Sequence, residues 1–180
     1  MSKKIKIAVV GAGHLGRFHS RLLSKHPAYD LVAVVDPSES ARMSVARESG
    51  ARSCESIHTL PEIGKIDAAV IATPTKYHGE IGESLLREGI HILVEKPLAL
   101  SVNQADALVY LAKSNNRILQ VGHIERFNPA LQKVYSQVER PQFIDARRHG
   151  GYSFRSTDIG VVLDLMIHDV DIALSLMKSK

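Results

Sequence analysis

Five short apolar runs alternate with amphipathic segments over the first two-thirds of the chain, and this rhythm narrows the choice of fold more than any other feature. The runs are IKIAVV (5–10), LVAVVD (31–36), DAAVIAT (67–73), HILVEK (91–96) and RILQVGH (117–123). They are almost continuously apolar, which is typical of parallel strands covered on both faces. The segments between them predict helices over residues 14–26, 75–89 and 101–115, the last with Ser101 as its N-cap.

A repeated strand–helix–strand order with right-handed crossovers predicts an α/β fold, a doubly wound parallel sheet of the Rossmann type. After residue 123 the rhythm changes. A helix begins near Pro129, residues 142–151 alternate like a strand, and a last helix begins at about residue 161. We therefore predict a dinucleotide-binding Rossmann domain over residues 1–123 and the beginning of a second α/β domain, for substrate, over residues 124–180.

Composition narrows the possible partners. Of 180 residues, 44% are hydrophobic and 23% charged, the mixture of a soluble globular protein. The net charge is only +4, the basic residues are scattered, and Trp is absent, so we expect no nucleic-acid partner. The apolar run at the N-terminus is too short for a signal peptide or a membrane span, which favours a cytoplasmic location and no membrane partner. A single cysteine, Cys54, excludes an internal disulfide and a cysteine-built metal site, and we predict no metal.

The first apolar run ends in a G-x-G-x-x-G sequence formed by Gly11, Gly13 and Gly16, with His14 and Leu15 between the last two. In a strand–loop–helix context, the first glycine permits a tight turn and the second lets the backbone approach a pyrophosphate. The third allows helix and strand to pack closely. Free N–H groups at the start of the helix then face the phosphates. The alternative is a tight turn that binds no ligand.

Asp36 ends the second apolar run, where a carboxylate can accept hydrogen bonds from the adenosine ribose. The same charge would repel a 2′-phosphate, so we predict NAD as the cofactor in preference to NADP. Ser38 and Arg42 lie close enough in sequence to weaken that preference. The alternative role for Asp36 is to cap the helix that follows Pro37.

Five motifs occur in order along the chain: GAGHLGRFH, ATPTKYH, EKPLA, VGHIERFNP and DLMIHDVD. Together they resemble the glucose–fructose oxidoreductase / inositol dehydrogenase family, the Gfo/Idh/MocA NAD(P)-dependent oxidoreductases, from about residue 4 to the end. The resemblance implies an enzyme that oxidises or reduces sugars or cyclitols. The segments VGHIERFNPAL and DIGVVLDLMIHDVD are similar to members that act on nucleotide-linked N-acetylhexosamines.

The resemblance also implies roles for individual residues. The catalytic set is Lys96 of the EKP motif with Asp164 and His168 of the D-x-x-x-H motif. Lys96 also lines the cofactor side, and the other residues there are Thr73, Pro74, His78 and Glu95. The residues near the nicotinamide or the substrate are His123, Arg126 and Asn128.

The catalytic set also has a chemical basis of its own. Lys96 follows a central strand, where open α/β sheets bind ligands, and its alternative role is that of a surface lysine beside a proline turn. Asp164 and His168 are four residues apart and so face one side of the last helix. A histidine oriented by a carboxylate is a general-base arrangement. The alternatives are an exposed ion pair contributing about 0.3–0.5 kcal/mol, or a metal site that lacks a third ligand.

The expected reaction is hydride transfer between a sugar carbinol carbon and the nicotinamide, with His168 as the base, Asp164 orienting it and Lys96 stabilising the alkoxide. In the family, most of the second domain's sheet follows the D-x-x-x-H helix. Few residues follow it here, so we expect a truncated second domain, and a homo-oligomer stays possible although its interface sheet is expected to be missing. A non-catalytic dinucleotide-binding module and redox-assisted glycosidic cleavage stay open as alternative functions.

Overall fold

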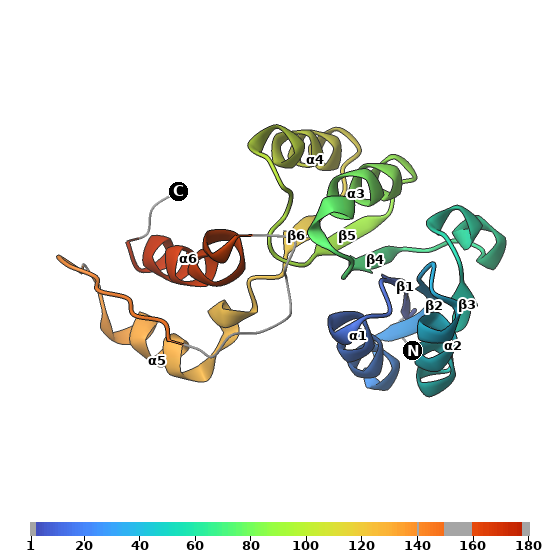
Figure 1. The fold of residues 1–180 in the computed structure, drawn as a ribbon, viewed down its shortest axis with the longest axis horizontal. Helices are drawn as coiled ribbons and strands as arrows, with labels where there is room; N and C mark the ends of the chain where they lie inside the picture. Colours follow the sequence, from blue (N-terminus) through green and yellow to red (C-terminus); the bar gives the residue numbers. More distant parts are fainter. Residues whose placement is uncertain (1–2, 140, 150–159, 178–180) are drawn as a thin grey trace. The chain divides into compact units, whose positions relative to one another are not determined.

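The computed structural model describes residues 3–139, 141–149 and 160–177, and the chain forms two compact units, Met1–Val121 and Gly122–Lys180. The first unit is a six-stranded parallel sheet in the order β3-β2-β1-β4-β5-β6 (Figure 1). Its strands are β1 (Ile5–Val10), β2 (Tyr29–Val35), β3 (Arg52–Cys54), β4 (Ala68–Ile71), β5 (His91–Val94) and β6 (Leu119–Val121). This order reverses direction between β1 and β4, which is the Rossmann topology, so the predicted fold class is confirmed.

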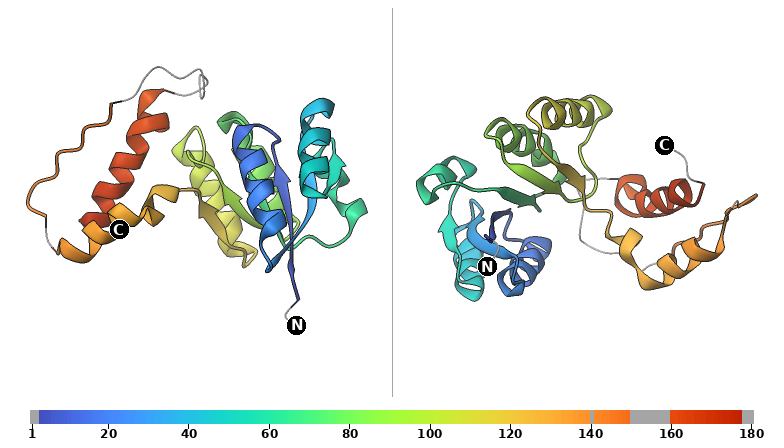
Figure 2. Two further views of the ribbon diagram at one scale, coloured as in Figure 1. Left: turned by 90° about the horizontal axis from the view of Figure 1, so that it is seen from below. Right: turned by 180° about the vertical axis from the view of Figure 1, so that it is seen from behind.

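Helices cover both faces of this sheet (Figures 1 and 2). One face carries α1 (His14–Lys25) and α2 (Glu39–Ser49), and the other carries α3 (His78–Arg87) and α4 (Val102–Ser114). The three predicted helices are confirmed, and Ser101 caps α4 by accepting a hydrogen bond from the backbone of Gln104. The predicted helix at 75–89 differs in its first turn: Thr75–Tyr77 forms a 3₁₀ turn, η2, closed by a bond from Tyr77 N–H to the Pro74 carbonyl.

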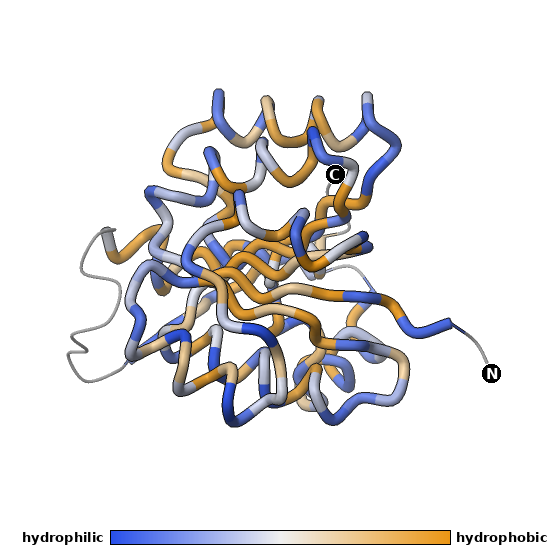
Figure 3. Tube along the Cα trace, turned by 90° about the vertical axis from the view of Figure 1, so that its right-hand side faces the viewer, coloured by the Kyte–Doolittle hydropathy of each residue, from blue (hydrophilic) through white to orange (hydrophobic). Residues whose placement is uncertain are grey.

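The strands are apolar because helices cover them on both sides. Val9 in β1, Val34 in β2 and Ile71 in β4 are completely removed from solvent. Figure 3 shows the hydrophobic colour running along the strands and along the inner faces of the helices. Burial of each such side chain contributes about 1.5–3 kcal/mol relative to leaving it exposed. This packing fixes the carboxyl ends of the central strands, where the candidate site residues lie.

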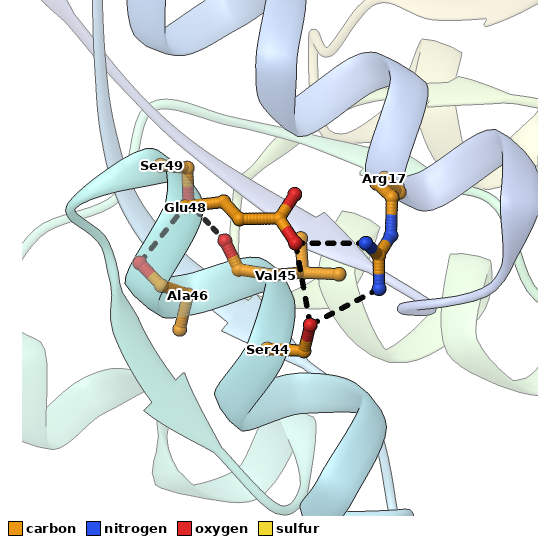
Figure 4. A network of polar contacts seen from close by, with 6 residues as sticks. All are labelled: Arg17, Ser44, Val45, Ala46, Glu48 and Ser49. Atoms are coloured by element: carbon orange, nitrogen blue, oxygen red, sulfur yellow. Dashed lines mark hydrogen bonds and ion pairs between the residues drawn. The ribbon is translucent and has the colours of Figure 1, made fainter.

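The edge strand β3 and the 3₁₀ turn η1 (Ile57–Ile63) were not predicted, and the helix after Pro37 was expected without bounds. The edge strand β3 has only three residues, and of these only Cys54 is apolar and buried, so no apolar run marks it. Helix α2 begins after Ser38, whose hydroxyl accepts a hydrogen bond from the Ala41 N–H. It packs beside α1 through a polar network in which the Arg17 guanidinium lies 2.7 Å from a Glu48 carboxylate oxygen (Figure 4).

The second unit contains a 3₁₀ turn, η3 (Ile124–Phe127), helix α5 (Pro129–Gln137), a π-helical turn, η4 (Val162–Met166), and helix α6 (Ile167–Leu176). The helices predicted near Pro129 and from residue 161 are confirmed. The strand predicted over 142–151 is wrong for residues 142–149, which form no strand, whereas residues 150 and 151 lie outside the described residues. Alternation alone does not make a strand, because a strand also needs a hydrogen-bonded neighbour. In the part of the chain that the structure describes, no helix is long and apolar enough to cross a membrane.

Candidate functional site

The predicted cofactor residues of the first unit lie in the loops that follow β1, β2, β4 and β5, or at the start of the helices α1 and α3 that two of these loops lead into. In a parallel sheet the carboxyl ends of the strands lie at one edge, and the reversal of strand order between β1 and β4 opens a crevice there. The glycine loop follows β1, Asp36 follows β2, Thr73 and Pro74 follow β4, and Glu95 and Lys96 follow β5. The sheet therefore brings these residues to one edge from four separate segments.

The three glycines of the loop have different surroundings. Gly11 has φ +103°, and a Cβ there would lie 2.5 Å from the carbonyl oxygen of Ala72. A Cβ on Gly16 would lie 1.8 Å from the carbonyl oxygen of Gly11, so helix α1 contacts the turn directly. A Cβ on Gly13 would meet no atom within 4 Å. Gly11 and Gly16 thus shape the loop, whereas Gly13 leaves open space beside the first turn of α1, in which His14 and Leu15 are exposed.

Asp36 binds the glycine loop through its carboxylate. Its Oδ2 accepts a hydrogen bond from the Ala12 N–H at 2.7 Å, and its Oδ1 accepts one from the Ser38 N–H at 2.8 Å. A carboxylate offers about four acceptor positions, so capacity remains for ribose hydroxyls. The helix cap itself is Ser38, and Arg42 donates to the carbonyl oxygen of Pro37 at 3.0 Å.

The loop after β4 carries Thr73 and Pro74 and leads into α3. The Thr73 hydroxyl is buried, and no group in the described segments hydrogen-bonds to it. Pro74 is exposed. His78, the first residue of α3, is only 1% exposed, and its two ring nitrogens each lie 2.9 Å from a carbonyl oxygen, Nε2 from that of Thr73 and Nδ1 from that of Pro97. The buried ring of His78 therefore contacts both the loop after β4 and the loop after β5, which carry predicted site residues.

The EKP segment follows β5. Glu95 is 6% exposed, and its Oε1 lies 2.7 Å from Nε2 of His19 in α1. Lys96 is half-buried, and its peptide bond to Pro97 is cis. His19 is a contact that the sequence analysis missed. His19 follows Gly16 by three positions in α1, and this helical spacing, which places it on the same face as the close-packed glycine, is the signal that could have found it.

In the second unit, Arg126 and Asp171 form a bidentate ion pair. Arg126 Nε lies 2.8 Å from Asp171 Oδ2, and Nη2 lies 2.5 Å from Oδ1. Asp171 is 8% exposed, and Nδ1 of His123 lies 3.9 Å from the same carboxylate. The pKa of the Asp171 carboxyl lies below its ordinary value, chiefly because Arg126 donates hydrogen bonds to it. Burial alone would raise this pKa, whereas the electrostatic effects of His123 and His168 lower it further. The same hydrogen bonds raise the pKa of Arg126.

The remaining predicted residues of the second unit lie on three elements. Asn128 caps α5 by accepting a hydrogen bond from the Ala130 N–H at 3.0 Å. Asp164 lies in the π-helical turn η4, and His168 is the second residue of α6, both half-buried. Single π-helical turns occur frequently at functional sites. Within residues 3–139, 141–149 and 160–177, no group of three or more His, Cys, Asp or Glu side chains is arranged to hold a metal ion.

Comparison with known proteins identifies relatives of the whole chain. The UDP-N-acetylglucosamine 3-dehydrogenase of Acidithiobacillus ferrooxidans is 37% identical over 174 residues, which cover 96% of this chain and 54% of that enzyme. The scyllo-inositol 2-dehydrogenase (NAD⁺) of Bacillus subtilis is 32% identical over 188 residues, covering 98% of this chain and 55% of that enzyme. The chain thus spans about half the length of the curated relatives it matches.

Solved structures and a family model agree with these relatives. A structure of the A. ferrooxidans enzyme superimposes with a TM-score of 0.90 at 35% identity, covering 98% of this chain and 58% of that one. GenD2 from gentamicin A biosynthesis, solved in complex with NAD, gives a TM-score of 0.87 at 26% identity, covering 98% of this chain and 54% of that one. Residues 5–123 match the model of the GFO/IDH/MocA oxidoreductase family, which is described by its NAD-binding Rossmann fold. The chain therefore belongs to the Gfo/Idh/MocA family of oxidoreductases, and its first unit is the NAD-binding Rossmann fold of that family.

Proposed function

We propose that this chain belongs to an NAD-dependent oxidoreductase that transfers a hydride between a ring carbinol of a sugar and the nicotinamide. The observation that carries the proposal is the open space at Gly13 next to the carboxylate of Asp36. A pyrophosphate needs close backbone approach and free N–H groups, and the adenosine ribose needs an acceptor. The loop after β1 and the end of β2 supply these features within the first unit.

The residues present suit NAD more than NADP. A 2′-phosphate would add negative charge beside the Asp36 carboxylate, which already accepts two backbone hydrogen bonds. Arg42, the nearest cation in sequence, donates to the Pro37 carbonyl and so has a partner of its own. The cofactor, when bound, supplies the hydride chemistry, and the protein supplies binding, orientation and charge.

The catalytic roles are part of the proposal. Lys96, at the carboxyl end of β5, donates a hydrogen bond to the reacting oxygen and stabilises negative charge on it. His168 accepts the proton of the substrate hydroxyl in the oxidative direction, and Asp164 orients the imidazole. The substrate class follows from the A. ferrooxidans relative, whose name specifies UDP-N-acetylglucosamine, and we propose a nucleotide-linked N-acetylhexosamine. A homo-oligomer and a cytoplasmic location stay predictions.

The test begins with calorimetric titration of the protein with NADH and NADPH, because a chain without Trp suits fluorescence transfer poorly. We expect NADH to bind more tightly than NADPH. Turnover is then measured with UDP-N-acetylhexosamines and with inositols. Lys96→Ala and His168→Ala should both lose turnover, and His168→Ala should bind NADH as the wild type does. Absence of NADH binding by the folded protein would refute the proposal, and binding without turnover on any substrate would indicate a non-catalytic dinucleotide-binding module.

A further inference from the structure

The residues immediately before and after Lys96 each contact a histidine from a different helix. Glu95 Oε1 lies 2.7 Å from Nε2 of His19 in α1, and the Pro97 carbonyl oxygen lies 2.9 Å from Nδ1 of His78 in α3. Helices α1 and α3 cover opposite faces of the sheet (Figure 1). The segment that carries Lys96 is therefore contacted from both faces.

Each of these contacts has one buried side chain, and His19 is partly exposed. Among the buried polar side chains of the first unit, His78 is 1% exposed and Glu95 is 6% exposed. Buried polar groups are unfavourable unless they are hydrogen-bonded, so each of these contacts restricts the arrangement of the groups that make it. The Glu95 N–H also donates to the Ile71 carbonyl at 2.9 Å, which extends the pairing of β5 with β4 as far as the residue before Lys96.

The same two histidines reach the segments that shape the cofactor site. Nε2 of His78 lies 2.9 Å from the Thr73 carbonyl oxygen, so one ring joins the loop after β4 to the loop after β5. His19 lies on α1, the helix that begins directly after the glycine loop.

We propose that His19 and His78 are positioning residues that fix the backbone of Lys96 relative to the glycine loop and the Thr73 loop. The inference rests on the proposed function, in which Lys96 contacts the reacting oxygen. Neither histidine touches substrate in this role. Catalysis is sensitive to placement, since a displacement of about 1 Å can reduce the rate by roughly a hundredfold. Loss of either contact therefore lowers kcat, and the contact of His19, which is not among the predicted cofactor residues, can be removed with the affinity for NADH nearly unchanged.

The first test replaces His19, whose side chain is partly exposed and therefore suited to substitution. His19→Leu removes the contact with Glu95, and His19→Gln keeps an N–H donor of similar reach. We expect His19→Leu to lower kcat by at least roughly tenfold, with KM and the NADH Kd within about twofold, and we expect His19→Gln to recover most of the loss. His58→Leu, at an exposed histidine of the 3₁₀ turn η1 (Ile57–Ile63), is the matched control and should behave as the wild type does.

A second measurement does not depend on turnover. Amide hydrogen exchange of Glu95, Lys96 and Leu98 is followed in the wild type, in His19→Leu and in the pair His78→Phe and His78→Gln. We expect faster exchange at these three amides in His19→Leu and His78→Phe, and partial protection in His78→Gln. Unchanged exchange in His19→Leu would overturn the proposal, as would an unchanged kcat in an active enzyme. If the wild type binds NADH but turns over no sugar, the proposed function fails and the exchange result still decides the positioning role.

Discussion

A methyl group added at Gly16 and the same methyl group added at Gly13 should affect the protein in different ways. At Gly16 the new Cβ would lie 1.8 Å from the Gly11 carbonyl oxygen and 2.7 Å from the Gly11 carbonyl carbon, where ordinary contact begins at 3.4 Å. The obstacle is backbone, so helix α1 and the loop must separate by more than roughly 1 Å. At Gly13 the Cβ would meet nothing within 4 Å.

The two effects differ in magnitude. Overpacking lowers the free energy of unfolding by about 1–3 kcal/mol, and we expect a value near 3 kcal/mol at Gly16 because the atoms in the way belong to the backbone and cannot rotate aside. The higher helix propensity of Ala offsets about 1 kcal/mol of this. We expect Gly16→Ala to lower the free energy of unfolding by about 2 kcal/mol, which lowers the melting temperature of a chain of this length by roughly 4–8 °C. Gly13 has extended backbone angles that Ala also adopts, so Gly13→Ala should change stability by less than about 1 kcal/mol, mainly through poorer capping of α1.

Cofactor binding separates the variants further. In Gly13→Ala the methyl group occupies the space through which the pyrophosphate approaches, and we expect NADH affinity to fall at least about tenfold, or 1.4 kcal/mol. Thermal melts and calorimetric titration with NADH measure the two quantities on the same samples. If Gly13→Ala binds NADH as tightly as the wild type, the open space does not receive the pyrophosphate. If Gly16→Ala melts at the wild-type temperature, the close contact of α1 with Gly11 is not required.

Three further outcomes follow from the polar contacts. Asp36→Ala should weaken NADH binding, because the acceptor for the ribose is lost, and should reduce the preference for NADH over NADPH, because the charge that repels a 2′-phosphate is lost. An affinity for NADH equal to that of the wild type, measured by calorimetry, would contradict this. Arg126→Ala should destabilise the fold by about 1–2 kcal/mol in urea unfolding at neutral pH, a value discounted because the guanidinium is half exposed. Since the pKa of Asp171 is lowered by folding, its contribution is present above its unfolded pKa and is lost as the pH falls through the lowered value, so wild type and Arg126→Ala should converge in stability in acid. Ser101→Ala should cost about 1 kcal/mol through loss of the cap on α4, checked by the same unfolding assay with Ser114→Ala as a control.

Much of the first unit can be predicted from the sequence, because its strands are buried on both faces and appear as continuous apolar runs. The edge strand β3 could not be predicted in this way, since three residues with one buried side chain make no pattern. The prediction of a strand at 142–151 was wrong over the described residues 142–149, because alternation of apolar and polar residues says nothing about whether a neighbouring strand is present.

Contacts between side chains that are far apart in sequence could not be predicted from the sequence. The glycine loop and Asp36 are local patterns with a known chemical purpose, so their positions follow from spacing. The contact between His19 and Glu95 joins residues 76 positions apart, and the pair of Arg126 with Asp171 joins residues 45 positions apart. No pattern within a single helix or strand encodes such pairs, because they depend on how the elements pack.

The hydrogen bond from the Ala12 N–H to Asp36 bears on any attempt to redesign the cofactor preference of this protein. Substitution at position 36 is the natural way to admit a 2′-phosphate, but it also removes the acceptor that orients the backbone between Gly11 and Gly13. A variant with Asp36 replaced by a small apolar residue would leave a nearly buried N–H without a partner at the pyrophosphate turn. A productive exchange therefore retains a short acceptor such as Ser or Asn at position 36 and introduces the new cation at a neighbouring position.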